Sequence, residues 1–161
     1  MMRRVMIAAV SLMCPGLFVV SGEQTPAAAV FTAKQAEAGR AAYENSCGRC
    51  HTYTLLGRKG DEGEVPALES LPEPFLKFIG PRKRVPALVG KEFVAKYGHK
   101  TLADLFEFFR GAADSTPVSE LHMSDDTLVN ITAYILKSNG AKPGSQPLTT
   151  QTSALFRSVV E

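Results

Sequence analysis

Cys47, Cys50 and His51 are the residues whose types and spacing point most directly to chemistry in this chain. They belong to the stretch Cys-Gly-Arg-Cys-His, in which an imidazole follows directly after a pair of closely spaced thiols. This stretch is the attachment signature of a covalent c-type haem. From one turn of chain each thiol can join one haem vinyl group, and the next side chain then points at the iron. The sequence therefore predicts one haem c per chain, held by Cys47 and Cys50, with His51 as an iron ligand.

Other sites can be built from the same residue types. A thiol-redox pair has this cysteine spacing but occurs in a βαβ context, whereas the residues before Cys47 have a helical pattern. A zinc site could combine Cys47 and Cys50 with His99 and His122, although the histidines of zinc sites are usually close in sequence. A chance pair of buried cysteines is the remaining interpretation. The haem interpretation is favoured because an export signal and an all-helical pattern agree with it.

Residues 1–22 have the layout of a secretory signal peptide. Arg3 and Arg4 precede an apolar run from Val5 to Val20, and Ser21-Gly22 follows as a small-residue cleavage region. The alternative is an uncleaved membrane anchor. However, Pro15-Gly16 breaks the run, which is shorter than the roughly 20 residues that a membrane-spanning helix needs. We therefore expect an exported, periplasmic protein that meets the membrane only through its partners.

Removal of this segment changes the composition of the chain. The full sequence has 18 basic and 16 acidic residues, a net charge of +2, and loss of Arg3 and Arg4 brings this to zero. Nucleic-acid binding therefore lacks its usual basic surface. Cys14 also leaves, so that Cys47 and Cys50 are the cysteines that remain. Met123 becomes the sole methionine out of five.

The pattern along the chain predicts an all-α fold of three to five helices with long loops. Thr32 and Gln35 form a capping box at the start of the first helix, and Ser124 is a good N-cap for the last. The predicted helices are 32–45, 91–97, 102–110 and a last one that ends at Asn139-Gly140. Residues 52–90 are predicted loop with at most short helical turns, and residues 111–122 are also predicted loop. The basic cluster Arg82–Arg84 lies in the first of these segments.

Several segments together resemble the class I c-type cytochromes. They are FTAKQAEAGRAAYENSCGRCH from Phe31, VPALVGKEF from Val85, and AYILKSNGAKPG from Ala133. The resemblance implies a cytochrome c domain over 31–140, a C-terminal extension over 141–161, and a first helix that crosses the last at Gly39 and Tyr43. It also implies that the Pro86 carbonyl accepts a hydrogen bond from His51 Nδ1, with Pro66 as the competing acceptor.

The second axial ligand of the iron is where the sequence departs from this family. Most such cytochromes use a methionine there, and the family position falls on Thr116-Pro117. Met123 is the predicted replacement, although a residue just before the Ser124 cap often packs against the first turn of its helix instead. His122 and His99 are the other candidates. With none of these the sixth position would be open to a small gas or peroxide.

The resemblance implies one-electron transfer without substrate turnover, so no catalytic acid or base is assigned. The tail 141–161 resembles extensions on cytochromes that serve alcohol or sugar dehydrogenases. The expected donor is therefore a dehydrogenase, and the expected acceptor is another cytochrome or an oxidase. The alternative function is a haem-based sensor or gas-binding domain with an open sixth site.

Overall fold

A computed structural model describes residues 29–59, 70–76, 78–79, 84–116, 119 and 121–160. The fold is mostly helical with little strand, in agreement with the predicted all-α class. The predicted signal peptide, Pro66, Arg82, Lys83 and Pro117 lie outside the described residues. None of the helices in the described part is long and apolar enough to cross a membrane. The described elements are α1 (Ala33–Asn45), α2 (Gly48–His51), β1 (Arg58–Lys59), α3 (Glu73–Leu76), β2 (Arg84–Val85), α4 (Lys91–Tyr97), α5 (Leu102–Asp114), α6 (Asp125–Ser138) and α7 (Phe156–Val160).

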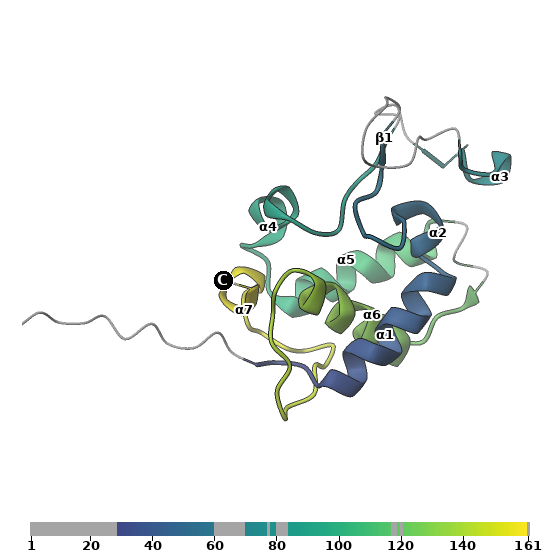
Figure 1. The fold of residues 1–161 in the computed structure, drawn as a ribbon. Helices are drawn as coiled ribbons and strands as arrows, with labels where there is room; N and C mark the ends of the chain where they lie inside the picture. The colour runs from purple at the N-terminus through teal and green to yellow at the C-terminus, as the bar shows by residue number, and fades with distance from the viewer. Residues whose placement is uncertain are drawn as a thin grey trace, which may run out of the picture.

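Helices α1 and α6 cross at Gly39 and form the centre of the fold (Figure 1). At the crossing, a Cβ added to Gly39 would lie 1.8 Å from the backbone oxygen of Asn130. The ring centroids of Tyr43 and Tyr134 are 5.3 Å apart, so the two aromatic side chains pack across the same interface. The crossing at Gly39 and Tyr43 that the resemblance implied is therefore present.

We expect Gly39→Ala to destabilise the protein by about 1–3 kcal/mol, because its methyl group would force the two helix backbones apart. Alanine has a higher helix propensity than glycine, and this offsets up to ~1 kcal/mol of the cost of the clash. Gly111→Ala is the matched control, since Gly111 lies in helix α5 with nothing within 4 Å of its added Cβ. Urea unfolding of both variants tests this. Equal effects at the two positions would contradict the close crossing.

Helices α1, α5 and α6 begin where the sequence predicted. Each of these starts is fixed by a hydrogen bond to a side chain only a few residues away. Thr32 accepts a hydrogen bond from the Gln35 N–H at 3.2 Å, and the Gln35 side chain accepts one from the Thr32 N–H at 3.1 Å. Thr101 and Asp104 form the same reciprocal pair at α5, and Ser124 caps α6. Such local pairs can be read from sequence.

Helix α5 is longer than the sequence predicted. It continues to Asp114, so residues 111–114, predicted as loop, are helical. Ala112 and Ala113 favour helix, and Ala113 is buried in the core. Gly111 lies on an exposed part of the helix, with nothing within 4 Å of an added Cβ.

A short antiparallel pair of strands lies in the region predicted as loop. In this pair Arg58 of β1 is opposite Val85 of β2, and Lys59 is opposite Arg84. Two residues per strand are too few to give an alternating pattern in the sequence. The pairing brings the chain after α2 beside the segment that carries Pro86.

The described part of the predicted C-terminal extension, 141–161, packs on the helices. Leu148, Phe156 and Val159 belong to the same buried core as the helices. The tail backbone also pairs with the α4–α5 region, where Leu102 N donates to Ala154 O and Phe156 N donates to Lys100 O, each at 2.9 Å. Scattered apolar residues separated by turns carry no periodic signal. The described tail, 141–160, therefore contributes buried side chains to the core.

Candidate functional site

The Cys47–His51 stretch lies in a tight helical turn at the end of α1. The N–H groups of Cys50 and His51 both donate to the carbonyl of Cys47, at 3.1 and 2.9 Å. The turn is fixed to α1 because the buried Tyr43 hydroxyl donates to the Thr52 carbonyl at 2.9 Å. Both thiols are free. One rigid turn therefore presents all three of the side chains that the sequence singled out.

His51 makes the contact that the resemblance implied. Its Nδ1 lies 2.8 Å from the carbonyl oxygen of Pro86. Because a carbonyl can only accept, Nδ1 carries the proton and Nε2 keeps a lone pair for a metal. Burial lowers the pKa of His51, and the bond to Pro86 opposes this. The competing acceptor, Pro66, lies outside the described residues.

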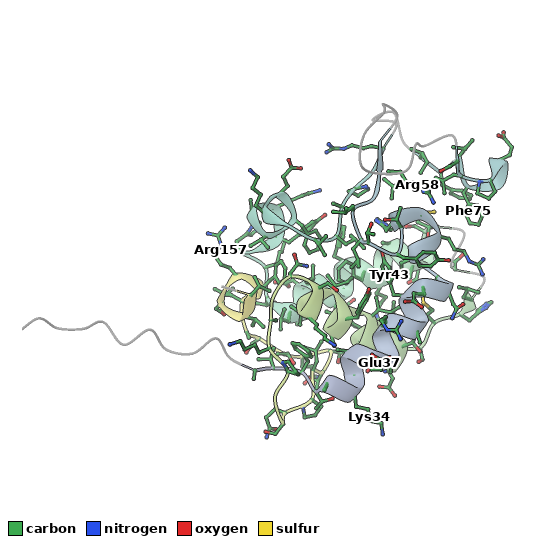
Figure 2. The ribbon with its side chains drawn as sticks, in the orientation of Figure 1. Lys34, Glu37, Tyr43, Arg58, Phe75 and Arg157 are labelled. Carbon is green, nitrogen blue, oxygen red and sulfur yellow. The ribbon has the colours of Figure 1, made fainter. Side chains whose placement is uncertain are left out.

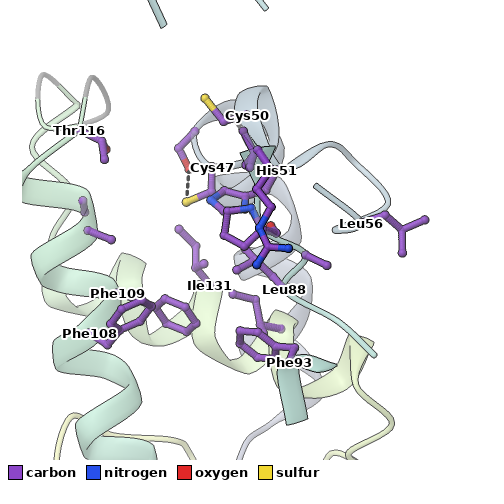
Figure 3. A pocket seen from close by; sticks show the side chains of 18 of the residues that line it. Cys47, Cys50, His51, Leu56, Leu88, Phe93, Phe108, Phe109, Thr116 and Ile131 are labelled. Atoms are coloured by element: carbon purple, nitrogen blue, oxygen red, sulfur yellow. Dashed lines mark hydrogen bonds between the residues drawn. The ribbon is translucent and has the colours of Figure 1, made fainter. Parts of the chain in front are cut away.

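A cavity of about 390 Å³ opens beside this turn, and Cys47, Cys50 and His51 all line it (Figure 3). The volume is in the range of small-molecule and cofactor sites. Helices α4, α5 and α6 supply apolar walls, among them Phe93, Phe108, Phe109, Leu128, Ile131 and Ile135. Figure 3 shows Cys47, Cys50 and His51 facing α5 with Phe108, Phe109 and Thr116.

The mouth of the cavity is open to solvent and carries both apolar and charged side chains. Leu56, Phe78 and Phe108 line the cavity with 42%, 48% and 47% of their surface exposed, and the exposed charged residues Arg84, Glu92 and Lys96 also line it. The sequence did not mark the three apolar residues, because Leu56 and Phe78 lie in predicted loop and Phe108 lies on the exposed side of α5. An apolar ligand in this cavity would therefore keep one edge near the surface.

The candidates for the second axial ligand differ in whether they line the cavity. Thr116, at the end of α5, lines the cavity. Met123 does not line it and instead packs, partly buried, against the core beside the Ser124 cap. His122 and His99 are exposed and are also absent from the lining. The ligand role of Met123 stays a prediction, and its position matches the alternative packing role.

The geometry of the described residues gives little support to the thiol-redox and zinc interpretations. Burial raises the pKa of both Cys47 and Cys50, although Arg58 opposes the rise at Cys50, whereas redox-active thiols have lowered values. Within the described residues, no three His, Cys, Asp or Glu side chains gather as metal ligands. His99 and His122 are thus not brought to the cysteines.

Gly57 holds the segment after the turn against Pro86, and its importance was not visible in the sequence. Its N–H donates to the His51 carbonyl at 3.0 Å, and its φ is +76°. An added Cβ would lie 2.2 Å from the Val85 oxygen and 2.8 Å from the Pro86 oxygen. A side chain at 57 would therefore displace the acceptor of the His51 bond.

We expect Gly57→Ala to weaken the His51–Pro86 hydrogen bond, so that the Nδ1 proton exchanges faster with solvent. Gly90→Ala is the matched control, because Gly90 also has a positive φ, +89°, but nothing lies within 4 Å of its added Cβ. Both changes cost about 1–3 kcal/mol of backbone strain. NMR exchange of the His51 ring proton separates them. Similar exchange in the two variants would contradict the proposed clash.

The site therefore offers a pair of thiols for covalent attachment, one imidazole nitrogen for a metal, and an apolar chamber beside them. No protein-family model, curated protein or solved structure matches the chain.

Proposed function

We propose that this chain is an exported mono-haem c-type cytochrome that carries single electrons. The observation that carries the proposal is that Cys47, Cys50 and His51 line one cavity while His51 Nδ1 bonds to Pro86. These residues fit the group, since Cys47 and Cys50 would hold haem c through thioether bonds and His51 Nε2 would bind its iron. When bound, the haem supplies a ferrous–ferric couple.

The residues around the cavity then control that couple. The Pro86 carbonyl fixes the orientation of the His51 ring and makes it a more basic ligand. The apolar side chains of α4, α5 and α6 exclude water from the interior. At the open mouth, Leu56, Phe78 and Phe108 leave an edge accessible for electron exchange with a partner.

The proposed compartment is the periplasm, which rests on the signal-peptide pattern of residues 1–22. The proposed donor is a dehydrogenase and the proposed acceptor is a respiratory cytochrome or oxidase. This assignment rests on the resemblance of residues 141–161 to tails of cytochromes that serve alcohol or sugar dehydrogenases. Such a carrier performs no substrate turnover.

A second candidate function is a haem-based sensor or gas-binding domain. The observation that favours it is that Thr116, and not Met123, lines the cavity. Threonine is not a usual ligand of haem iron. If no other side chain enters, the sixth position is available to a small gas.

The experiment is a visible spectrum of the purified holoprotein, before and after acid–acetone extraction. The proposal expects haem that survives extraction and a low-spin ferric spectrum. A weak far-red band that disappears in Met123→Ala, but not in His122→Ala, identifies Met123 as the ligand. A high-spin spectrum, with carbon monoxide binding that displaces no ligand, supports the gas-binding function. Loss of all haem on extraction overturns both.

A further inference from the structure

Arg58 connects the attachment turn to the segment that carries Pro86. Its Nε donates to the Cys50 carbonyl at 3.2 Å, and its NH2 group donates to the Arg49 carbonyl at 3.2 Å. Its NH1 group contacts the Ser70 hydroxyl. We propose that Arg58 is a positioning residue that holds His51 and its hydrogen-bond acceptor in register.

The carbonyls of Arg49 and Cys50 belong to the end of α2, where helix carbonyls lack partners within the helix. The Arg58 guanidinium satisfies two of them at once with charge-assisted bonds, which are stronger than neutral ones. Its planar fork is rigid, so that two neighbouring carbonyls are held in one geometry. The side chain of Arg58 therefore binds the turn at the two residues directly before His51.

The backbone of Arg58 holds the segment that carries Pro86, the hydrogen-bond acceptor of His51. Arg58 is paired with Val85 in the β1–β2 ladder, and Pro86 is the next residue after Val85. Leu88 N also donates to the Leu55 carbonyl at 2.8 Å, so that the two segments are joined on both sides of Pro86. One residue thus binds the iron-ligand turn with its side chain and the acceptor strand with its main chain. Figure 2 places Arg58 above Tyr43, on the side of the molecule that carries α2.

This inference rests on the proposed haem attachment at Cys47, Cys50 and His51. If the hydrogen bonds from the Arg58 side chain are lost, the Pro86 carbonyl is held less firmly against His51 Nδ1. A weaker bond makes the imidazole a less basic ligand, and this disfavours the ferric state. The reduction potential should therefore rise.

The main variant is Arg58→Lys, which keeps the charge but loses the fork. Arg49→Lys is the matched control, because Arg49 also lies close to Cys50 while its guanidinium makes no hydrogen bond with the described residues. We expect an upward shift of the reduction potential in Arg58→Lys and an unchanged potential in Arg49→Lys. A second pair, Arg58→Gln and Arg49→Gln, removes one positive charge at each site, so their difference should show the same upward shift.

Covalent haem per chain is measured in every protein. Wild-type protein without covalent haem would overturn the proposed function and this inference with it. Wild-type protein with haem, but with equal potentials in the Arg58 and Arg49 variants, would overturn the inference alone. If neither Arg58 variant folds while both Arg49 variants do, Arg58 is a general stabilising residue and the positioning role is also overturned.

Discussion

We expect the Cys47→Ser, Cys50→Ser double variant to be exported without any covalent haem. A serine hydroxyl does not form the thioether bond with a haem vinyl group, and both thiols line the cavity in which the haem would lie. The measurement is the haem absorbance per chain that remains after acid–acetone extraction. The expected result is complete loss, against one haem per chain in the wild type.

Two further variants test whether the loss has the proposed cause. Each single variant, Cys47→Ser or Cys50→Ser, keeps one thiol and is expected to retain at most one thioether link. Cys14→Ser is the control, because Cys14 lies in the predicted signal peptide and would be removed with it. Haem that survives extraction from the double variant would place the attachment elsewhere. A loss of haem in Cys14→Ser would contradict the predicted cleavage.

The second large effect is expected at Phe156, in the C-terminal tail. Its side chain has 0% exposure and packs edge-on against Phe93, with ring centroids 5.5 Å apart. Removing a buried phenylalanine side chain costs about 3–5 kcal/mol. We therefore expect Phe156→Ala to lower the free energy of unfolding by this amount, as measured by urea unfolding of the holoprotein.

Leu155→Ala is the matched control for Phe156→Ala. Leu155 is the preceding residue, 47% exposed, and its bridge to Thr101 uses only backbone atoms. Surface substitutions of this kind change stability by about 0.5 kcal/mol or less. Because Phe93 also lines the cavity, Phe156→Ala should broaden the haem spectrum as well. If the two alanine variants unfold alike, the tail is not part of the core.

Features of this protein that depend on a few adjacent residues were predictable from the sequence. The capping box at Thr32 and the N-cap at Ser124 place the starts of α1 and α6 correctly. Cys47, Cys50 and His51 share one turn because helical geometry sets the spacing of neighbouring side chains. The bond from His51 to Pro86 was expected only through the resemblance, since no local rule links residues so far apart.

Other features were decided by tertiary contacts. The packing of Phe156, the path of the β1–β2 pair and the extra turn of α5 each depend on partners distant in sequence. The same is true of the cavity wall, where Thr116 lies and Met123 does not. In the sequence Met123 could be either an iron ligand or a packing residue, because its thioether sulfur can bind iron and its flexible apolar chain can fill a core gap. The chain by itself thus predicted the candidate attachment residues and determined the helix starts. Only the folded structure decided which side chains surround the cavity, because that depends on how distant segments pack together.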